Sequence, residues 1–303
     1  MEIKSSNVRA KTEKDKKIVL QVTEPNELMK FLISELPGKS RNNIKSLLAH
    51  GQILLEQEIV SQYNHLLEAG QEVIVNLARA EDVSHLQGLK ILFEDAYIIV
   101  VEKPAGLLSV SSDTEKEQTA HSVLSAHLKR ANPKSRVFVV HRLDRETSGV
   151  MMFAKSQEIQ RSLQDDWKKV VLERSYIVVV EGIVTKEQDT ITSWLKQSKT
   201  LKVYSCPTPN DGQKAVTQYK RMKQSKKYSM LEARLETGRK NQIRVHMQDI
   251  GHSIIGDKKY GATTNPIKRL GLHARVLAFK HPINGEEVHI ETEIPKGFLG
   301  LFS

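Results

Sequence analysis

The sequence has almost no cysteine and no long apolar run. Cys206 is the single cysteine among 303 residues, so a disulfide within the chain and a zinc site of several thiolates are both excluded. A lone cysteine is also usual in a reducing compartment. No stretch approaches the roughly 18 apolar residues of a membrane-spanning helix, and the charged N-terminus lacks the apolar segment of a secretory signal. We therefore expect a cytoplasmic protein.

Acidic residues are outnumbered by basic ones, 36 to 46, which gives a formal net charge of +10. The excess is uneven, because residues 1–87 hold 11 basic and 12 acidic residues whereas residues 88–303 hold 35 and 24. A surplus of this size attracts polyanions. Nucleic acid is the first candidate partner, ahead of an anionic membrane surface.

The length and the composition along the chain predict two domains. Residues 1–17 are polar and are expected to form an N-terminal tail. Residues 18–80 are typical of a small α+β domain, and residues 81–88 of a polar linker that ends in glycine. Residues 89–303 contain many short apolar strands and few helices, which predicts an α+β fold with a mixed, mainly antiparallel sheet.

Three helices are expected from apolar spacing and capping residues. The first domain holds two, with apolar residues at Leu28, Phe31, Leu32, Ile44, Leu47 and Leu48. Ser40 is the expected N-cap of the second, and Gly51 its expected end. In the second domain we expect one helix over residues 157–174, capped by Ser156. On the second helix Arg41 and Lys45 share a face, which could meet phosphate or simply be solvated.

The stretch "HRLDRETSGV" (residues 141–150) places one carboxylate, Asp144, between Arg142 and Arg145. The apolar residues 137–140 before it predict a buried strand, and Gly149 begins the next one, so the polar residues lie on a loop. Loops on a rigid sheet often carry chemistry. Asp144 is either a functional acid or a salt-bridge anchor for its neighbours, and the spacing alone favours neither.

A second basic element, residues 235–262, is punctuated by glycines and is predicted to form a strand, a turn and a strand. It carries Arg239 and Arg244 and could close a pocket over an acid. Histidines occur here and later in the chain, at His246, His252, His273 and His281. Without further cysteines or an H-E-x-x-H helix we expect no metal site.

Five segments of the second domain resemble, in order, the motifs of the RluA-type pseudouridine synthases. "HRLDRETSG" is similar to the signature H-R-L-D-x-x-T-S-G of this family. The other four are "FEDAYIIVVEKPAGLLSV", "RSYIVVVEG", "GRKNQIRVHMQDIGHSIIGDKKYG" and "LGLHARVLAFKHP". The first domain resembles the RNA-binding module of the ribosomal S-four type, although Leu54, Leu55 and Glu56 stand where Val-Asn-Gly is common.

The resemblance implies a pseudouridine synthase fold and the isomerisation of specific uridines to pseudouridine in structured RNA. It implies that the partner is RNA and not a membrane, and that neither a cofactor nor a metal is required. We expect a monomer. Ribosomal RNA and transfer RNA both stay open. In the first domain, Lys39, Arg41 and Lys45 are the expected RNA contacts.

By position, Asp144 matches the family's essential acid, as nucleophile or as base. Arg244 matches the arginine that pairs with this acid, and an aspartate opposite a guanidinium stays ionised at neutral pH. We expect its two parallel N–H donors to hold both carboxylate oxygens. Tyr176 would stack on the uracil and assist catalysis, with Leu272 on the other side of the base.

Arg142 would enter the space that the extruded uridine leaves, since extrusion costs a few kcal/mol. His141, Arg239 and Gln242 complete the expected substrate contacts. The sequence departs from the family at Lys240 and Asn241, where Thr-His is more usual, which could alter contacts with RNA.

Two other readings compete with an isomerase. One is a catalytically inactive RNA-binding or ribosome-assembly factor of the same fold. The other is hydrolysis by paired carboxylates, using Asp144 with Glu146 or Asp257. A pure binder needs no acid among its arginines, so the sequence favours the isomerase.

Overall fold

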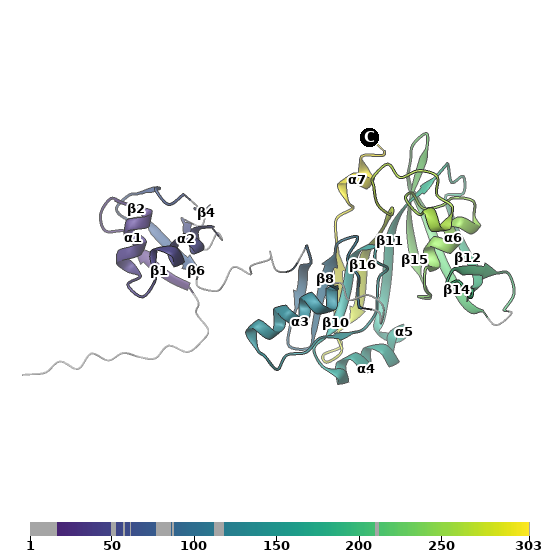
Figure 1. Cartoon of the computed structure of the whole chain (residues 1–303), viewed down its shortest axis with the longest axis horizontal. Helices are drawn as coiled ribbons and strands as arrows, with labels where there is room; N and C mark the ends of the chain where they lie inside the picture. The colour runs from purple at the N-terminus through teal and green to yellow at the C-terminus, as the bar shows by residue number, and fades with distance from the viewer. Residues whose placement is uncertain are drawn as a thin grey trace, which may run out of the picture. The chain divides into compact units, whose positions relative to one another are not determined.

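A computed structural model divides the chain into two compact units, Met1–Asp82 and Val83–Ser303 (Figure 1). The residues described are 17–49, 53–56, 58–60, 62–76, 86, 88–111, 118–209 and 212–302. The expected tail lies outside them except for Lys17, and the expected linker except for Leu86 and Gly88. The division between the units falls within that linker segment.

In the smaller unit the described residues form two helices, a four-stranded antiparallel sheet and a two-stranded ribbon. The sheet has the order β1 (Lys17–Gln21), β6 (Glu72–Asn76), β3 (Ile53–Leu55) and β4 (Glu58–Ile59). The ribbon pairs β2 (Asn26–Glu27) with β5 (Leu66–Leu67), and the helices are α1 (Leu28–Glu35) and α2 (Arg41–Ala49).

The apolar positions predicted on these helices form the core of the smaller unit. All six are buried, together with strand residues such as Ile53, Val73 and Val75. Oγ of Ser40 accepts a hydrogen bond from the backbone N–H of Asn43, 3.3 Å away, as expected of an N-cap. Gly51, the expected end of α2, lies outside the described residues.

The larger unit is built on one sheet, to which the described residues contribute 11 strands. Among the described strands of this sheet, β10 and β16 form the one parallel pair and the other pairs are antiparallel, which confirms a mixed, mainly antiparallel sheet. The neighbouring strands are, in order, β13 (Val203–Cys206), β12 (Gln188–Gln197), β14 (Gln213–Gln224), β15 (Tyr228–Leu235), β11 (Val171–Glu181), β16 (Leu272–Lys280), β10 (Ser148–Ala154), β8 (Ile98–Lys103) and β7 (Lys90–Glu94). In addition, β9 (Phe138–Val139) pairs with β10 and β17 (Glu287–Glu291) with β16.

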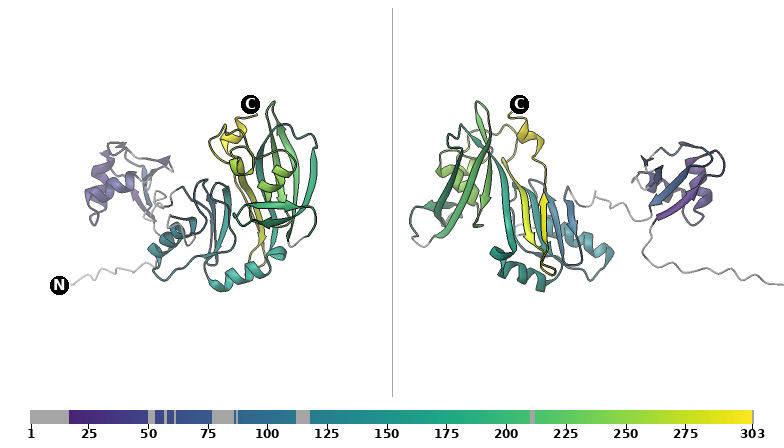
Figure 2. Two further views of the ribbon diagram at one scale, coloured as in Figure 1. Left: turned by 45° about the vertical axis from the view of Figure 1, so that its right-hand side comes forward. Right: turned by 180° about the vertical axis from the view of Figure 1, so that it is seen from behind.

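Helices α3 and α4 cover opposite faces of strands β8 and β10 (Figure 2). Ile99 and Val101 pack with α3, whereas Ile98 and Val100 pack with α4, as the alternation of side chains along a strand requires. The helices of this unit are α3 (Ala120–Ala131), α4 (Gln157–Asp165), α5 (Trp167–Val170), α6 (Gln242–Asp249) and α7 (Lys296–Leu299). None of the described helices is long and apolar enough to span a membrane.

The predicted helix over residues 157–174 is correct at its start and wrong at its end. Oγ of Ser156 accepts from the N–H of Ile159, which caps α4. The chain then turns at Asp166, forms the single turn of α5, and enters β11 at Val171. The strand therefore begins earlier than its apolar run suggests.

The predicted strand–turn–strand over residues 235–262 is wrong, because α6 occupies its middle. Asn241 has a left-handed backbone (φ 56°) where the helix begins. Five of the eight helical residues are buried, so α6 has no simple apolar stripe. The alternation of Ile243, Val245 and Met247 in the sequence is typical of a strand, and tertiary packing overrides it.

The loop that carries Asp144 is fixed at its far end by the one parallel strand pair. Gly149 of β10 lies opposite Ala274 of β16, with φ at +115°. A Cβ atom at Gly149 would lie 2.0 Å from the carbonyl oxygen of Ala274, so only glycine fits. This close approach brings the loop next to Leu272 at the start of β16.

Candidate active site

Asp144 lies at a pocket of about 300 Å³ that four separate segments enclose. They are the loop after β9, strand β11, the segment from the end of β15 into α6, and the start of β16. The pocket is lined by Arg142, Leu143, Asp144, Thr147, Tyr176, Leu235, Gly238, Arg239, Lys240, Asn241, Gln242, Ile243, Arg244 and Leu272. Of the site residues expected in this unit, Asp144, Tyr176, Arg244, Arg142, Leu272, Arg239 and Gln242 line this pocket, and His141 does not.

Asp144 and Arg244 form the predicted ion pair, across 100 residues of sequence. Nη1 of Arg244 lies 3.5 Å from Oδ2 of Asp144. This separation is longer than an ordinary N–H···O hydrogen bond. The Asp144 side chain is 31% exposed, so its carboxylate keeps accepting positions open toward the pocket.

The expectation that Arg244 holds both oxygens of Asp144 is wrong, because Asp257 occupies that position. Nε and Nη2 of Arg244 donate to the two carboxylate oxygens of Asp257, each at 2.7 Å. The Asp257 side chain is 1% exposed. A bidentate pair of this kind fixes the plane of the guanidinium. Asp257 thus aims the remaining nitrogen, Nη1, at Asp144.

Tyr260 and Asn241 hold the other sides of Arg244. The guanidinium lies over the ring of Tyr260, with its Cζ 4.8 Å from the ring centre. Oδ1 of Asn241 accepts from Nη1 of Arg244 at 3.2 Å, and its Nδ2 donates to the hydroxyl of Tyr260 at 3.0 Å. Asn241, one of the two residues that depart from the family, therefore supports the arginine, while Lys240 is exposed at the pocket.

Burial and the charges of the pocket together shift the pKa values of Arg244 and Tyr176. Burial alone would lower the pKa of Arg244, but its hydrogen bonds to Asp257 and the charges of Asp257 and Asp144 raise it. Burial raises the pKa of Tyr176; the Arg174 guanidinium opposes that rise and the Asp144 charge adds to it. At neutral pH the phenol of Tyr176 is therefore uncharged.

Lys103 holds the Asp144 loop from behind. Its side chain is fully buried, and its ammonium donates to the carbonyls of Pro104, Leu107 and Arg145 at 2.6 to 3.0 Å. Burial lowers the pKa of Lys103 to about 8. Three carbonyls use all three of its donors, so we assign Lys103 to the support of the loop.

Two expected substrate contacts, His141 and Gln242, are used within the protein. Nε2 of His141 accepts the N–H of Met152, and burial together with the Arg174 charge lowers its pKa to about 3. The amide of Gln242 donates to Val216 and Thr217 and accepts two further hydrogen bonds at its oxygen. These four hydrogen bonds use the full capacity of the amide, which positions the start of α6. Gln242 also lines the pocket, and its contact with substrate stays a prediction.

The remaining expected contacts face the pocket. Arg142 is exposed, and no hydrogen bond or ion pair from its guanidinium occurs within the described residues. Arg239 is exposed and donates from Nε to the carbonyl of Lys214 at 3.2 Å. Leu272 is buried at the inner wall. A cation at the rim and an apolar wall inside suit a polyanion that inserts a flat, uncharged group.

Known proteins are similar to this chain in sequence and in fold. Residues 97–249 match the family model of RNA pseudouridylate synthases. The chain is 33% identical to an uncharacterized RNA pseudouridine synthase of Bacillus subtilis, over 90% of this chain and 91% of that one. It is 31% identical to ribosomal large subunit pseudouridine synthase D of Haemophilus influenzae, over 88% of this chain and 87% of that one. The chain belongs to the RluA-type family of RNA pseudouridine synthases.

This pseudouridine synthase is an isomerase that acts on RNA, as the resemblance predicted. Its fold is shared with the human RNA pseudouridylate synthase domain containing 4, with a TM-score of 0.58 and 23% identity. That comparison covers 72% of this chain and 92% of the human one. The predicted fold class is therefore confirmed.

The four histidines considered above for a metal site bond to hydroxyls, to a carbonyl in the case of His252, and to a carboxylate in the case of His281. His246 bonds Thr217 and Ser193, His273 bonds Ser148 and Thr292, and His281 bonds Asp95. In the part of the chain that the structure describes, no group of three or more His, Cys, Asp or Glu side chains is placed to hold a metal.

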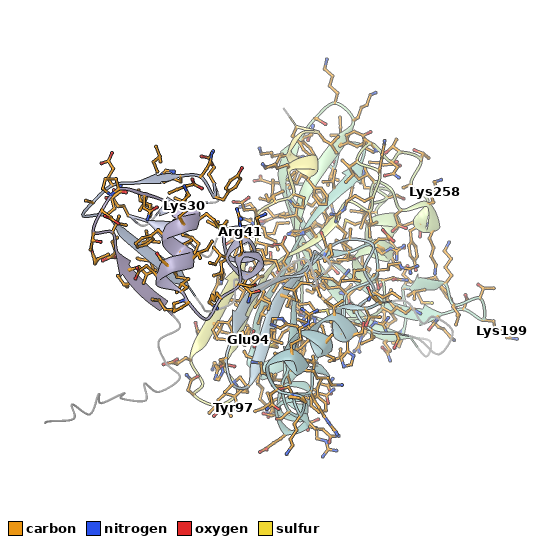
Figure 3. The ribbon with its side chains drawn as sticks, turned by 60° about the vertical axis from the view of Figure 1, so that its left-hand side comes forward. Lys30, Arg41, Glu94, Tyr97, Lys199 and Lys258 are labelled. Carbon is orange, nitrogen blue, oxygen red and sulfur yellow. The ribbon has the colours of Figure 1, made fainter. Side chains whose placement is uncertain are left out.

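The basic residues predicted on the smaller unit are accessible. Arg41 and Lys45 are exposed on α2, and Lys39 just before it is partly exposed. Figure 3 labels Arg41, whose helix turns its apolar residues into the core of that unit. Whether these cations contact RNA stays a prediction.

The sequence did not single out Lys103 or Arg174, and it offered Asp257 only as a second carboxylate for hydrolysis and not as the partner of Arg244. Lys103 and Asp257 lie within segments that resemble family motifs, "EKPAG" and "IGDKKYG", but nothing in their spacing shows which side chains they meet. Arg174 directly precedes "SYIVVV", and was read as the end of a helix. A charged residue at the start of an apolar strand was the available signal.

Proposed function

We propose that the enzyme isomerises specific uridines in structured RNA, with ribosomal RNA of the large subunit as the first candidate and Asp144 as the essential residue. One observation supports this most. A partly exposed carboxylate, Asp144, faces a pocket whose walls include a neutral tyrosine, Tyr176, and an apolar residue, Leu272.

The reaction breaks the N-glycosidic bond, turns the uracil and forms a bond from its carbon 5 to carbon 1 of the ribose. The hydrogen at carbon 5 is lost as a proton, and N1 gains one, so the mass is unchanged. The carboxylate of Asp144 acts as nucleophile or as base, and Nη1 of Arg244 lies 3.5 Å from its Oδ2. Both routes fit the carboxylate's open oxygens.

The uracil is placed between Tyr176 and Leu272, which contribute an aromatic face and an aliphatic one. Because the phenol of Tyr176 is uncharged, it does not repel Asp144 or the uracil carbonyls. Arg142 stands at the mouth of the pocket and enters the space left in the RNA when the uridine is extruded. Its lack of a partner among the described residues leaves it available for that task.

The RNA class is inferred from charge and from relatives. Several similar proteins bear the name ribosomal large subunit pseudouridine synthase D, including that of Neisseria meningitidis at 32% identity over 88% of this chain. The net charge of +10 favours binding to a polyanion whose affinity falls with added salt. The exposed Arg41 and Lys45 on α2 add a second RNA contact from the smaller unit, which we propose as an RNA-binding module.

The test is release of tritium from RNA labelled at uracil carbon 5. Separate transcripts of large-subunit ribosomal RNA and transfer RNA serve as substrates, and Asp144→Asn is compared with the unmodified enzyme. We expect a rate lower by about 10³-fold or more for the variant. Equal release would exclude Asp144, and release from transfer RNA alone would change the substrate class.

The same assay separates the competing readings. Paired-carboxylate hydrolysis would liberate free uracil, but both oxygens of Asp257 already accept from Arg244 and Glu146 is exposed. An RNA-binding factor without catalysis would bind these transcripts and release no tritium. Intact RNA of unchanged mass, with tritium released, supports the isomerase.

A further inference from the structure

A second pocket, of about 700 Å³, adjoins the catalytic pocket. The two share Arg142, Tyr176, Leu235, Gly238 and Arg239, so one continuous ligand can occupy both. Its other walls are α5 with the residues just before it, the loop before Arg142, and Arg174 of β11. We call this space the flanking pocket.

Arg174 of the flanking pocket differs from Arg244 of the catalytic pocket in its partners. Arg244 contacts two carboxylates, whereas no carboxylate pairs with Arg174 among the described residues. The one hydrogen bond of its guanidinium runs from Nη2 to the carbonyl oxygen of Leu235, at 3.3 Å. A half-buried cation without a counter-charge is costly.

The surroundings hold the Arg174 guanidinium in place. Its Cζ lies 5.7 Å from the ring centre of Trp167, whose other neighbour is the ring of His141 at 5.2 Å. At Gly238 an added Cβ would lie only 2.6 Å from Nη1 of Arg174. The absence of a side chain at Gly238 therefore lets the guanidinium reach the backbone of the turn after β15.

The charge of the flanking pocket is positive overall. Five cationic side chains line it, against three acidic ones, and one acid is already paired, since Asp166 contacts Lys169 at 2.7 Å. The cations are Arg142, Lys168, Lys169, Arg174 and Arg239; the acids are Asp165, Asp166 and Glu236. His141 adds no charge at neutral pH.

We propose that Arg174 binds a phosphate of a nucleotide adjacent to the target uridine, in the flanking pocket. The proposal rests on the function proposed above, since it needs an RNA chain whose uridine occupies the catalytic pocket. A phosphate supplies the missing counter-charge, and guanidinium binds it through two parallel N–H donors. Trp167 and Gly238 act as positioning residues for Arg174.

The test measures binding of a fluorescein-labelled hexauridylate to the full chain at several salt concentrations. For Arg174→Gln we expect a Kd higher by about 10-fold, the loss of one charge-assisted contact, and a salt dependence weaker by about 0.7 in slope, one phosphate on a single strand. Tritium release should show a raised KM with kcat changed by less than about 3-fold.

A matched control and a second variant keep the result interpretable. Arg234→Gln removes an arginine from the neighbouring strand that is 56% exposed and paired with Glu173 and Glu232; binding should not change. Gly238→Ala keeps every charge but displaces the Arg174 guanidinium, so Kd should rise by about 3-fold with an unchanged slope.

Two outcomes would overturn the proposal. One is that Arg174→Gln has the Kd and the salt slope of the unmodified enzyme. The other is that Arg234→Gln weakens binding as much as Arg174→Gln does, which would show a general effect of charge. The binding experiment is repeated with Asp144→Asn as background. If that variant retains activity, the role of Asp144 fails while the effect of Arg174 on binding still decides this proposal.

Discussion

The two units of the chain place their polar groups in opposite ways. In the smaller unit the described core is wholly apolar, and charged side chains such as Arg41 and Lys45 are exposed. All buried polar residues found among the described positions lie in the larger unit, among them Lys103, Asp257 and His246. Buried polar networks cost stability unless every member is satisfied, and they fix a single geometry. The smaller unit, which we propose only to bind RNA, can omit such networks, whereas a unit that must hold an active site needs them.

The comparison is tested most strongly at the buried pair of Asp257 and Arg244. Asp257→Asn keeps the volume but removes the counter-charge, and should displace the Arg244 guanidinium from Asp144. We expect kcat to fall by about 10²-fold, the cost of misplacing a catalytic group by about 1 Å. The free energy of unfolding should also fall by about 3 kcal/mol, because a buried charge loses its partner.

The control for Asp257 is an exposed pair of the same chemistry. Asp189 accepts from Lys186 at 2.6 Å on the surface of the larger unit. Asp189→Asn should leave kcat and the denaturation midpoint unchanged. Equal effects of the two substitutions, measured by tritium release and urea denaturation, would show that burial does not separate them.

A second prediction concerns acid stability. Burial lowers the pKa of His246 and of His273 to about 4, the nearby Arg269 and Arg275 adding to the effect at His273. The unfolded chain takes up these protons near pH 6.5 and the folded chain near pH 4, so stability is lost as pH falls through that window. Each histidine should lower the free energy of unfolding by up to about 1.4 kcal/mol for each pH unit within that window.

Urea denaturation of the larger unit at pH 7, 6 and 5 measures this loss. His246→Gln removes one titrating group. The slope of the unfolding free energy against pH should therefore decrease by the contribution of one proton, up to about 1.4 kcal/mol per pH unit. A free energy that does not change between pH 7 and pH 5 would contradict the prediction.

The smallest effect is expected on the smaller unit. The double substitution Arg41→Gln, Lys45→Gln should weaken RNA binding by a few-fold and reduce the salt slope by about 1 to 2, with kcat unchanged, since only exposed charges are removed. Lys30→Gln on α1, an exposed lysine paired with Glu27 at 3.4 Å, is the matched control. Filter binding of ribosomal RNA at three salt concentrations separates the two.

The sequence allowed the family, the sheet and the meeting of Asp144 with Arg244 to be predicted, because each rests on a motif or on an apolar period. It did not allow α6 to be predicted, because a short helix buried on most sides has the alternation of a strand. Helix α3 was missed although Thr119 and Ser122 cap it and Ala120, Val123 and Leu124 follow helical spacing.

The partner of Arg244 was predicted in part, because local pattern carries no information on which of two acids is nearer. Asp257 and Asp144 both lie in family-like segments, and only the fold shows that the first holds the plane of the guanidinium while the second receives a single nitrogen. For the same reason the sequence did not show that the amide of Gln242, which was expected at the substrate, donates to Val216 and Thr217 of β14.

The single parallel pairing of β10 with β16 has a consequence for synthesis of the protein. Ser148 bonds to His273, which the ribosome adds 125 residues later. At 5 to 20 residues per second the two are made about 6 to 25 seconds apart. During that interval Asp144 has been translated while β16, which supplies Leu272 to the pocket wall, does not yet exist, so the pocket is not closed until β16 has been made.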